Sequence, residues 1–110
     1  MSIAELMSAT PLTKQRRALS LSRGRTSVYV EAFVWESFDA MCTDLTMPAR
    51  IVADMIDMNR DQSVDFTSAF RVAVLAYWRS SAERRRWVPA THLHAAMVAI
   101  GGTPPAAPAP

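Results

Sequence analysis

The sequence predicts a mainly α-helical domain that contains one short β-strand and forms a homodimer through it. Residues 25–30, Arg-Thr-Ser-Val-Tyr-Val, alternate between polar and apolar side chains, as is typical of a half-buried strand. The spacing then becomes helical, with apolar side chains at Val34, Phe38, Met41 and Leu45. No second strand is evident nearby. Because a lone strand leaves its backbone N–H and C=O groups unpaired, we expect it to pair with the same strand of a second chain.

Length and composition indicate a single folded domain. The chain has 110 residues, half of them hydrophobic, which is enough for a packed core. The net charge of +2 is unevenly distributed. Residues 1–30 contain five basic and one acidic residue, residues 31–66 two basic and eight acidic, and residues 67–110 five basic and one acidic. Basic ends suggest a polyanionic partner, although an ordinary solvated surface gives the same pattern.

Several classes of protein are disfavoured by the residues that the sequence lacks. Cys42 is the only cysteine, so we expect a buried structural thiol and no disulfide. His92 and His94 would point in different directions on a helix, so we expect no metal site. No glycine-rich phosphate loop or metalloprotease motif is found, so we expect neither an enzyme nor a cofactor. The absence of an apolar leader or a long apolar stretch predicts a cytoplasmic protein with no membrane partner.

We divide the chain into four parts. Residues 1–22 are expected to form a flexible basic arm, residues 23–87 the folded domain, residues 88–102 a short amphipathic helix and residues 103–110 a disordered Pro/Ala tail. The apolar stripe of the short helix is narrow and consists of Leu93, Met97 and Ile100. We therefore expect this helix to dock on its own domain or on a partner protein.

Three helices are expected inside the folded domain. The first should occupy about residues 32–43. The second should begin at Thr46, a good N-cap, with Pro48 in its first turn, and should end near Met58. The third should be capped by Asp65 or Thr67 and end before Pro89.

Three blocks of sequence resemble a bacterial ribbon-helix-helix family of the Arc and MetJ superfamily. Members typically read RTSVRLE…FW, then AEID, then LSSALRVFVLxYYR. The matching blocks here are Gly24-Arg-Thr-Ser-Val-Tyr-Val-Glu31 with Phe33-Val-Trp35, Ile51-Val-Ala-Asp-Met-Ile-Asp57, and Thr67-Ser-Ala-Phe-Arg-Val-Ala-Val-Leu-Ala-Tyr-Trp-Arg79. The resemblance covers roughly residues 24–80. It implies an intertwined homodimer, an intermolecular two-stranded antiparallel ribbon that enters the major groove of DNA, and an additional third helix.

The resemblance also implies roles for individual residues. The outward strand residues Arg25, Ser27 and Tyr29 would contact base edges. The first turn of the second helix, at Thr46 and Met47, would hold a phosphate on its free N–H groups, and Arg23 nearby would contact phosphate as well. Apart from the resemblance, the basic cluster that contains Arg16 and Arg17 suggests a phosphate-contacting arm, although a solvated leader gives the same sequence. The dimer core would be made of Val28, Val30, Val34, Trp35, Phe38, Met41, Ile51, Val52 and Met55. Tyr29 stands where the family often has arginine, and Pro48 removes one N–H group from the phosphate site.

The function that follows is sequence-specific binding of duplex DNA by a small transcriptional regulator, acting as a repressor and associated with the nucleoid. Two alternatives stay open. The chain could be the antitoxin of a toxin–antitoxin pair, with its C-terminal segment bound to the toxin. It could also be a dimeric protein-interaction module that does not bind DNA. Binding to DNA that weakens steeply with salt would separate the first two functions from the third.

Overall fold

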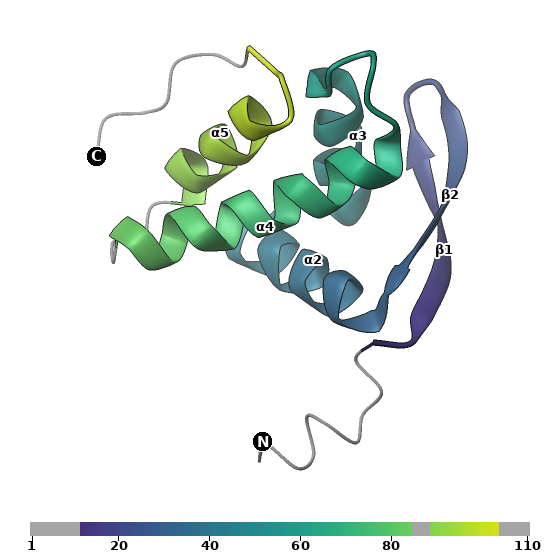
Figure 1. Ribbon diagram of the computed structural model, residues 1–110, viewed down its shortest axis with the longest axis horizontal. Coiled ribbons are helices and arrows are strands. Elements are labelled where there is room, and N and C mark those ends of the chain that lie inside the picture. Colours follow the sequence, from purple (N-terminus) through teal and green to yellow (C-terminus); the bar gives the residue numbers. More distant parts are fainter. Residues whose placement is uncertain (1–11, 85–88, 104–110) are drawn as a thin grey trace.

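The described part of the chain folds as a β-hairpin followed by four helices. The computed structural model describes residues 12–84 and 89–103. The elements in chain order are β1 (Lys14–Leu21), β2 (Gly24–Glu31), α2 (Ala32–Leu45), α3 (Ala49–Asn59), α4 (Phe66–Arg84) and α5 (Pro89–Ala99). The hairpin lies along one end of the helical body, beside α3 and the start of α2 (Figure 1). The sequence-based prediction of a mainly helical fold with a ribbon and a third helix is therefore correct.

Strand β2 finds its partner within its own chain, which corrects the expectation of a single strand. Strand β1 pairs with β2 in antiparallel register, from Lys14 opposite Glu31 to Leu21 opposite Gly24. Residues 14–21 are thus a strand and no part of a flexible arm, whereas residues 1–11 of the predicted arm lie outside the described residues. Gly24 has a φ of 127°, a backbone conformation that side chains disfavour, directly after the Ser22-Arg23 turn.

The junction between α2 and α3 differs from the prediction. Helix α2 ends at Leu45, and its C-cap Thr46 has a left-handed backbone with φ 54° and donates its N–H to Thr43 O. Pro48 is the N-cap of α3, so Thr46 closes one helix where it was expected to open the next. The proline suits this position because a helix N-cap needs no N–H donor and has an extended backbone.

Helix α4 begins where an aspartate can cap it. The Asp65 carboxylate accepts hydrogen bonds from the backbone N–H of Ser68 at 3.1 Å and from the Ser68 hydroxyl at 2.8 Å. Of the two caps considered from the sequence, Asp65 is therefore the one used. Helix α4 places Phe70 in the centre of the core, where the Phe70 ring centroid lies 5.1 Å from that of Trp35 and 4.7 Å from that of Phe38.

Helix α5 docks on its own domain. Leu93, Met97 and Ile100 are buried together with Ala96 against the rest of the core. A backbone hydrogen bond of 2.8 Å from Asp61 N–H to Ile100 O also joins the residue after α5 to the loop after α3. The segment after α4 therefore belongs to the core, and Pro89, which was expected to end a helix, is the first residue of α5.

A single chain covers most of the residues that were assigned to a dimer core. Six are buried: Val28, Val30, Trp35, Phe38, Met41 and Val52. Val34 and Met55 are partly buried, while Ile51 is 38% exposed because the inward face of α3 is Val52, Ala53 and Ile56. Helices α4 and α5 supply the cover that was expected from a second chain. The homodimer stays a prediction.

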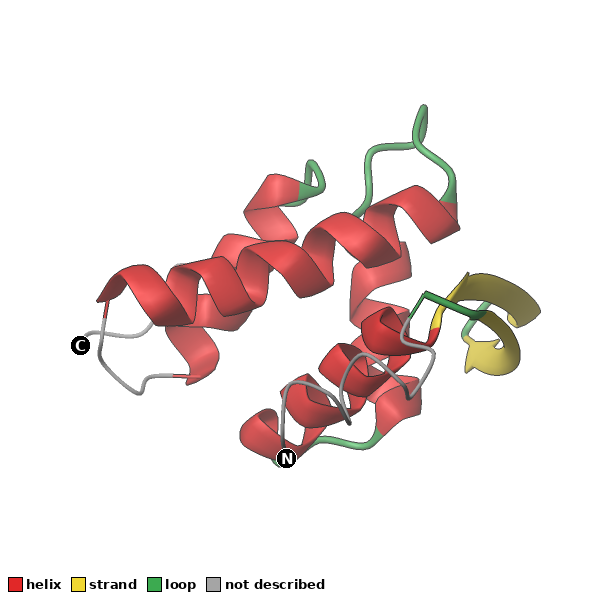
Figure 2. Ribbon diagram, turned by 60° about the horizontal axis from the view of Figure 1, so that its bottom comes forward, coloured by secondary structure: helices red, strands yellow, loops and turns green. Residues whose placement is uncertain are grey.

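No helix in the described residues combines the length and apolar character needed to cross a membrane. The outer side of the hairpin carries no described helix, as Figure 2 shows with the strands at the edge of the helical body. One face of the ribbon is therefore open to a partner.

Candidate nucleic-acid interface

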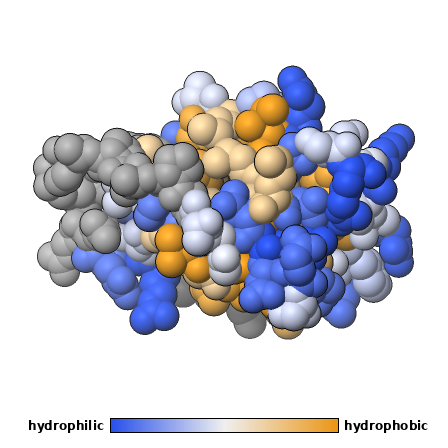
Figure 3. All heavy atoms as spheres, turned by 90° about the horizontal axis from the view of Figure 1, so that it is seen from above, coloured by the Kyte–Doolittle hydropathy of each residue, from blue (hydrophilic) through white to orange (hydrophobic). Residues whose placement is uncertain are grey.

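The hairpin, called the ribbon below, has one face packed on the helices and one face in solvent. Side chains alternate between the two faces of a strand, so every second residue points the same way. Leu19, Leu21, Val28 and Val30 are buried on the inner face. The outer face consists of Lys14, Arg16, Ala18 and Ser20 on β1 and Arg25, Ser27 and Tyr29 on β2, and at its end the half-buried Glu31 pairs with Arg71 of α4 at 2.7 Å. In the view of Figure 3 the end of the molecule that carries the ribbon is hydrophilic, and apolar side chains gather nearer the middle.

The three residues expected to contact bases do lie together on the outer face. Arg25, Ser27 and Tyr29 are all exposed, with 48% of Tyr29 accessible. Arg25 makes no ion pair with any residue in the described ranges, so its guanidinium is available to a ligand. Arg25, Ser27 and Tyr29 share this face because side chains at positions i, i+2 and i+4 of a strand point to the same side.

Strand β1 adds basic side chains that were predicted from the sequence to lie in a flexible arm. Arg16 stands opposite Tyr29 in the register, and its guanidinium carbon lies 4.9 Å from the Tyr29 ring centroid. The Lys14 ammonium lies 5.5 Å from the same centroid. Contacts of this kind hold a cation over the ring face at a modest gain in energy. Arg16 thus belongs to the same face as Tyr29, and it reaches Ser27 Oγ at 3.4 Å.

Arg17 points toward helix α2. Its guanidinium bonds both carboxylate oxygens of Asp39, at 3.0 and 3.1 Å, and lies 4.7 Å from the Trp35 ring. The Trp35 indole N–H in turn donates to Gln15 O at 2.9 Å. These contacts fasten β1 to α2. Arg17 therefore holds the ribbon in place, and the phosphate contact that was expected of it stays a prediction.

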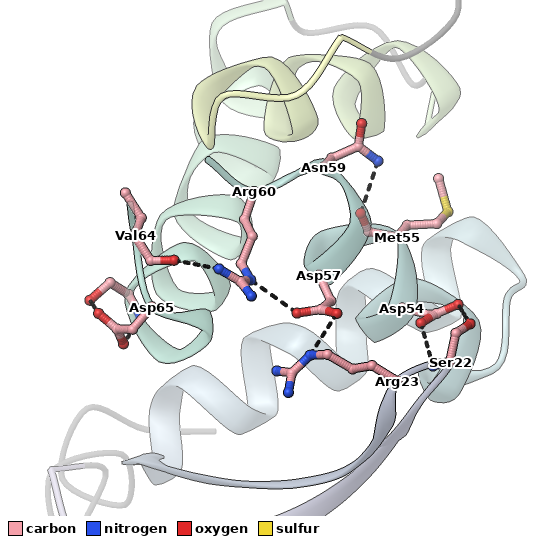
Figure 4. A network of polar contacts seen from close by, with 10 residues as sticks. Ser22, Arg23, Asp54, Met55, Asp57, Asn59, Arg60, Val64 and Asp65 are labelled. Atoms are coloured by element: carbon pink, nitrogen blue, oxygen red, sulfur yellow. Dashed lines mark hydrogen bonds and ion pairs between the residues drawn. The ribbon is translucent and has the colours of Figure 1, made fainter. Parts of the chain in front are cut away.

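The turn of the ribbon is fastened to α3 by two aspartates. Asp54 accepts hydrogen bonds from the backbone N–H of Ser22 at 2.7 Å and from its hydroxyl at 2.5 Å. Asp57, whose side chain is 9% exposed, lies between Arg23 at 2.9 Å and Arg60 at 3.0 Å (Figure 4). Arg23 was expected to contact phosphate; its Nε is bonded to Asp57 while about half of its side chain is exposed, so that contact stays a prediction.

The charge of Asp57 depends on this arrangement. Burial raises the pKa of Asp57, but hydrogen bonds and positive charge from Arg23 and Arg60 outweigh burial and hold the pKa below its usual value. Arg60 also donates to Val64 O at 2.8 Å, which ties the loop after α3 to the same cluster. The aspartate is therefore ionised at neutral pH and joins the ribbon turn to the helical body.

The start of α3 leaves backbone N–H groups free, three residues after the ones that were expected to be free. The N–H groups of Thr46 and Met47 donate to Thr43 O and Cys42 O, so neither is available to a ligand. Within the described residues the N–H groups of Ala49 and Arg50 make no hydrogen bond, as expected for the first turn of a helix. The positive end of the α3 helix dipole also lies at these N–H groups.

Arg50 is a basic residue near the ribbon that was not predicted from the sequence to belong to the interface. It lines a hollow of about 210 Å³ between α3 and the ribbon turn, together with Ser20, Leu21, Ser22, Ile51 and Asp54. It makes no ion pair with any described residue, whereas Asp54 is bonded to Ser22. The available signal was an isolated arginine, two residues after Pro48, in the acidic middle of the chain.

The remaining reactive side chains lie inside the core. Ser80 Oγ and His92 Nδ1 are 2.9 Å apart, but both residues are buried. Burial, with a smaller effect from Asp39, raises the pKa of Cys42 to about 11, so the thiol stays protonated at neutral pH. The expected buried structural cysteine is confirmed. In the described ranges no group of three or more His, Cys, Asp or Glu residues could hold a metal ion.

Comparison with known proteins agrees with this architecture. A family model described as a ribbon-helix-helix domain matches residues 14–78, more than half of the chain. The chain therefore belongs to the ribbon-helix-helix family. The match begins at the first residue of β1, so the whole hairpin lies within it.

One solved structure shows the same fold. It is an uncharacterized protein from Bordetella pertussis Tohama I, with a TM-score of 0.60 and 23% sequence identity. The similarity covers 84% of this chain and 78% of that one. At this identity the likeness concerns the fold alone. No curated protein matches the sequence.

Proposed function

We propose that the protein binds double-stranded DNA in a sequence-specific manner and acts as a small transcriptional regulator, a repressor associated with the nucleoid. The observation that carries the proposal is the outer face of the ribbon. In a ribbon-helix-helix domain, this face exposes Arg25, Ser27 and Tyr29 side by side, with no described helix over them. The major groove of B-DNA admits a two-stranded ribbon and displays a distinct pattern of donors and acceptors for each base pair.

Each exposed group suits a different part of the duplex. Arg25 can donate two hydrogen bonds to the O6 and N7 atoms of a guanine, the commonest specific contact of arginine with DNA. Tyr29 offers a hydroxyl and an aromatic edge to a base or a thymine methyl group. Arg50 and the two N–H groups at the start of α3 flank the ribbon and suit a backbone phosphate.

The test is to measure binding to duplex DNA at several salt concentrations by fluorescence anisotropy. Arg25→Ala should weaken binding to the preferred duplex by about 1–3 kcal/mol and relax the preference at one base pair. Arg50→Ala should weaken binding to all duplexes alike and reduce the slope of the salt dependence by about 1. Arg79→Ala is a matched control, because Arg79 is an exposed arginine on α4 that pairs with Glu83. Unchanged binding by Arg25→Ala would contradict the proposal.

The homodimer remains part of the proposal, in a revised form. Because the hairpin and the core are complete in one chain, a dimer would join two finished domains and would not complete one. Sedimentation equilibrium at micromolar concentration measures this directly. A monomer mass that does not change with concentration would rule out the proposed dimer, but it would not contradict DNA binding by the single domain.

The antitoxin alternative is less well supported by the position of α5. An antitoxin would need the segment after α4 to bind a toxin, but Leu93, Met97 and Ile100 pack into the chain's own core. A protein-interaction module that does not bind DNA is distinguished by the salt series. Such a module would show no binding to duplex DNA even at low salt.

A further inference from the structure

The two strands of the ribbon have different outer faces. When a ribbon is built from the same strand of two chains, a two-fold axis makes its halves identical. Here the antiparallel register places Arg16 opposite Tyr29, Ala18 opposite Ser27 and Ser20 opposite Arg25. No two-fold axis can relate these pairs. A duplex that contacts this face therefore meets different chemistry at its two ends.

Strand β1 is built into the domain and is not a loosely attached segment. Ala32 N–H donates to Thr13 O at 2.8 Å, so the start of β1 is joined to the start of α2. Leu19 and Leu21 are buried in the core, and Ser22 at the turn is bonded to Asp54. A β2 strand of another chain in the place of β1 would not supply Thr13, Leu19 or Leu21 for these contacts. The hairpin of one chain is thus the ribbon that DNA would meet.

The two ends of the outer face carry different groups. At the end nearer α2, Arg16 and Lys14 lie over the Tyr29 ring. At the turn end, Arg25 stands opposite the neutral Ser20. Four residues of strand, roughly 13 Å at about 3.3 Å per residue, separate Tyr29 from Arg25. This length corresponds to about four base pairs at a rise of about 3.4 Å. The middle of the face is made of small side chains, Ala18 and Ser27, which permit close approach to base edges.

We propose that each chain reads one asymmetric duplex element of about four base pairs, with β1 and β2 contacting different bases of it. The inference rests on the proposed DNA binding and adds the class of site that is bound. Arg25 reads a base pair at one end of the element, and Arg16, held over Tyr29, reads a base pair at the other end. A second copy of the chain beside the first would read a second complete element.

The experiment is a selection from a library of random duplexes, followed by sequencing of the bound DNA. It uses the full chain and three variants: Arg16→Ala, Arg25→Ala and the matched control Arg79→Ala. Arg16→Ala and Arg25→Ala should each relax the preference about tenfold at a single position. The two positions should differ and should lie about four base pairs apart. The control should select the same element as the unmodified chain. Circular dichroism and thermal unfolding verify that each variant is folded.

The possible results separate this inference from the proposed function. A palindromic element in which Arg25→Ala relaxes two symmetry-related positions, while Arg16→Ala relaxes none, would show a ribbon made of two chains. Uniformly weaker binding by Arg16→Ala would show that β1 contacts only phosphates. Either result overturns the asymmetric site and leaves DNA binding standing. Failure of the unmodified chain to retain any duplex overturns the proposed function itself.

Discussion

Replacement of Asp57 by asparagine tests whether one ionised side chain joins the ribbon to the helices. Asp57 accepts charged hydrogen bonds from Arg23 at 2.9 Å and from Arg60 at 3.0 Å. Asparagine keeps the size of the side chain but turns one acceptor into a donor that faces an arginine. The Arg60 side chain is only 17% exposed, so it loses a charged partner without free access to water. Arg23 is half exposed and can be hydrated in its place.

The expected loss follows from these two environments. A hydrogen bond to a charged group contributes about 1.5–3 kcal/mol, and this applies to the shielded Arg60. The exposed Arg23 pair adds less than about 1 kcal/mol because solvent screens it. The free energy of unfolding should therefore fall by about 2–3 kcal/mol at neutral pH. Asp54→Asn is the matched control, since Asp54 lies one turn earlier on the same helix, is only partly buried and bonds the neutral Ser22. Its effect should be smaller.

The pH dependence gives a second, independent check. The pKa of Asp57 lies below the ordinary value of 3.8, because the contribution of the arginines exceeds that of burial. A lowered pKa in the folded state means that the ionised carboxylate stabilises the fold above pH 3.8, and that this contribution is lost as the pH falls through the folded pKa. The difference between the unmodified chain and Asp57→Asn should narrow below pH 3.8 in urea unfolding monitored by circular dichroism. A difference under about 0.5 kcal/mol at neutral pH, or one that does not narrow in acid, would refute the reasoning.

Three further substitutions test the core. Val28→Asp places a charge in a fully buried site of the monomer and should abolish the folded circular dichroism signal; a folded variant would show that the inner face of the ribbon is not packed. Met97→Ala should cost about 2–5 kcal/mol in urea unfolding because Met97 on α5 is buried, whereas a loss near zero would mean that α5 is not docked. Tyr77→Phe should leave the melting temperature unchanged or raise it, because the buried hydroxyl has no hydrogen-bond partner among the described residues; a marked fall would reveal such a partner.

The outer half of the candidate interface could be predicted from the sequence because it depends on local geometry. In residues 25–30 the alternation alone places Arg25, Ser27 and Tyr29 on one side and Val28 and Val30 on the other. The structure confirms both faces. The start of α2 at Ala32 was likewise predictable, since the apolar spacing changes there from that of a strand to that of a helix.

The junction at Thr46 shows where local preference is insufficient. Threonine is a good helix N-cap, but here it takes a left-handed conformation and closes α2, so the N-cap of α3 passes to Pro48. Which of two neighbouring residues ends one helix and which opens the next depends on how both helices pack. As a result the free N–H groups belong to Ala49 and Arg50 and not to Thr46 and Met47.

The sequence by itself determined the family, the helical pattern and the residues that β2 turns outward, because each depends on spacing within a short segment. Only the tertiary structure decided that Lys14–Leu21 is a strand. That segment begins Lys-Gln-Arg-Arg, without alternation, and becomes a strand because β2 pairs with it and because Leu19, Leu21 and Trp35 lie in the same core. The tertiary structure also decided that α4 and α5 cover the core in place of a second chain, since burial of that apolar surface requires contacts between residues far apart in the sequence.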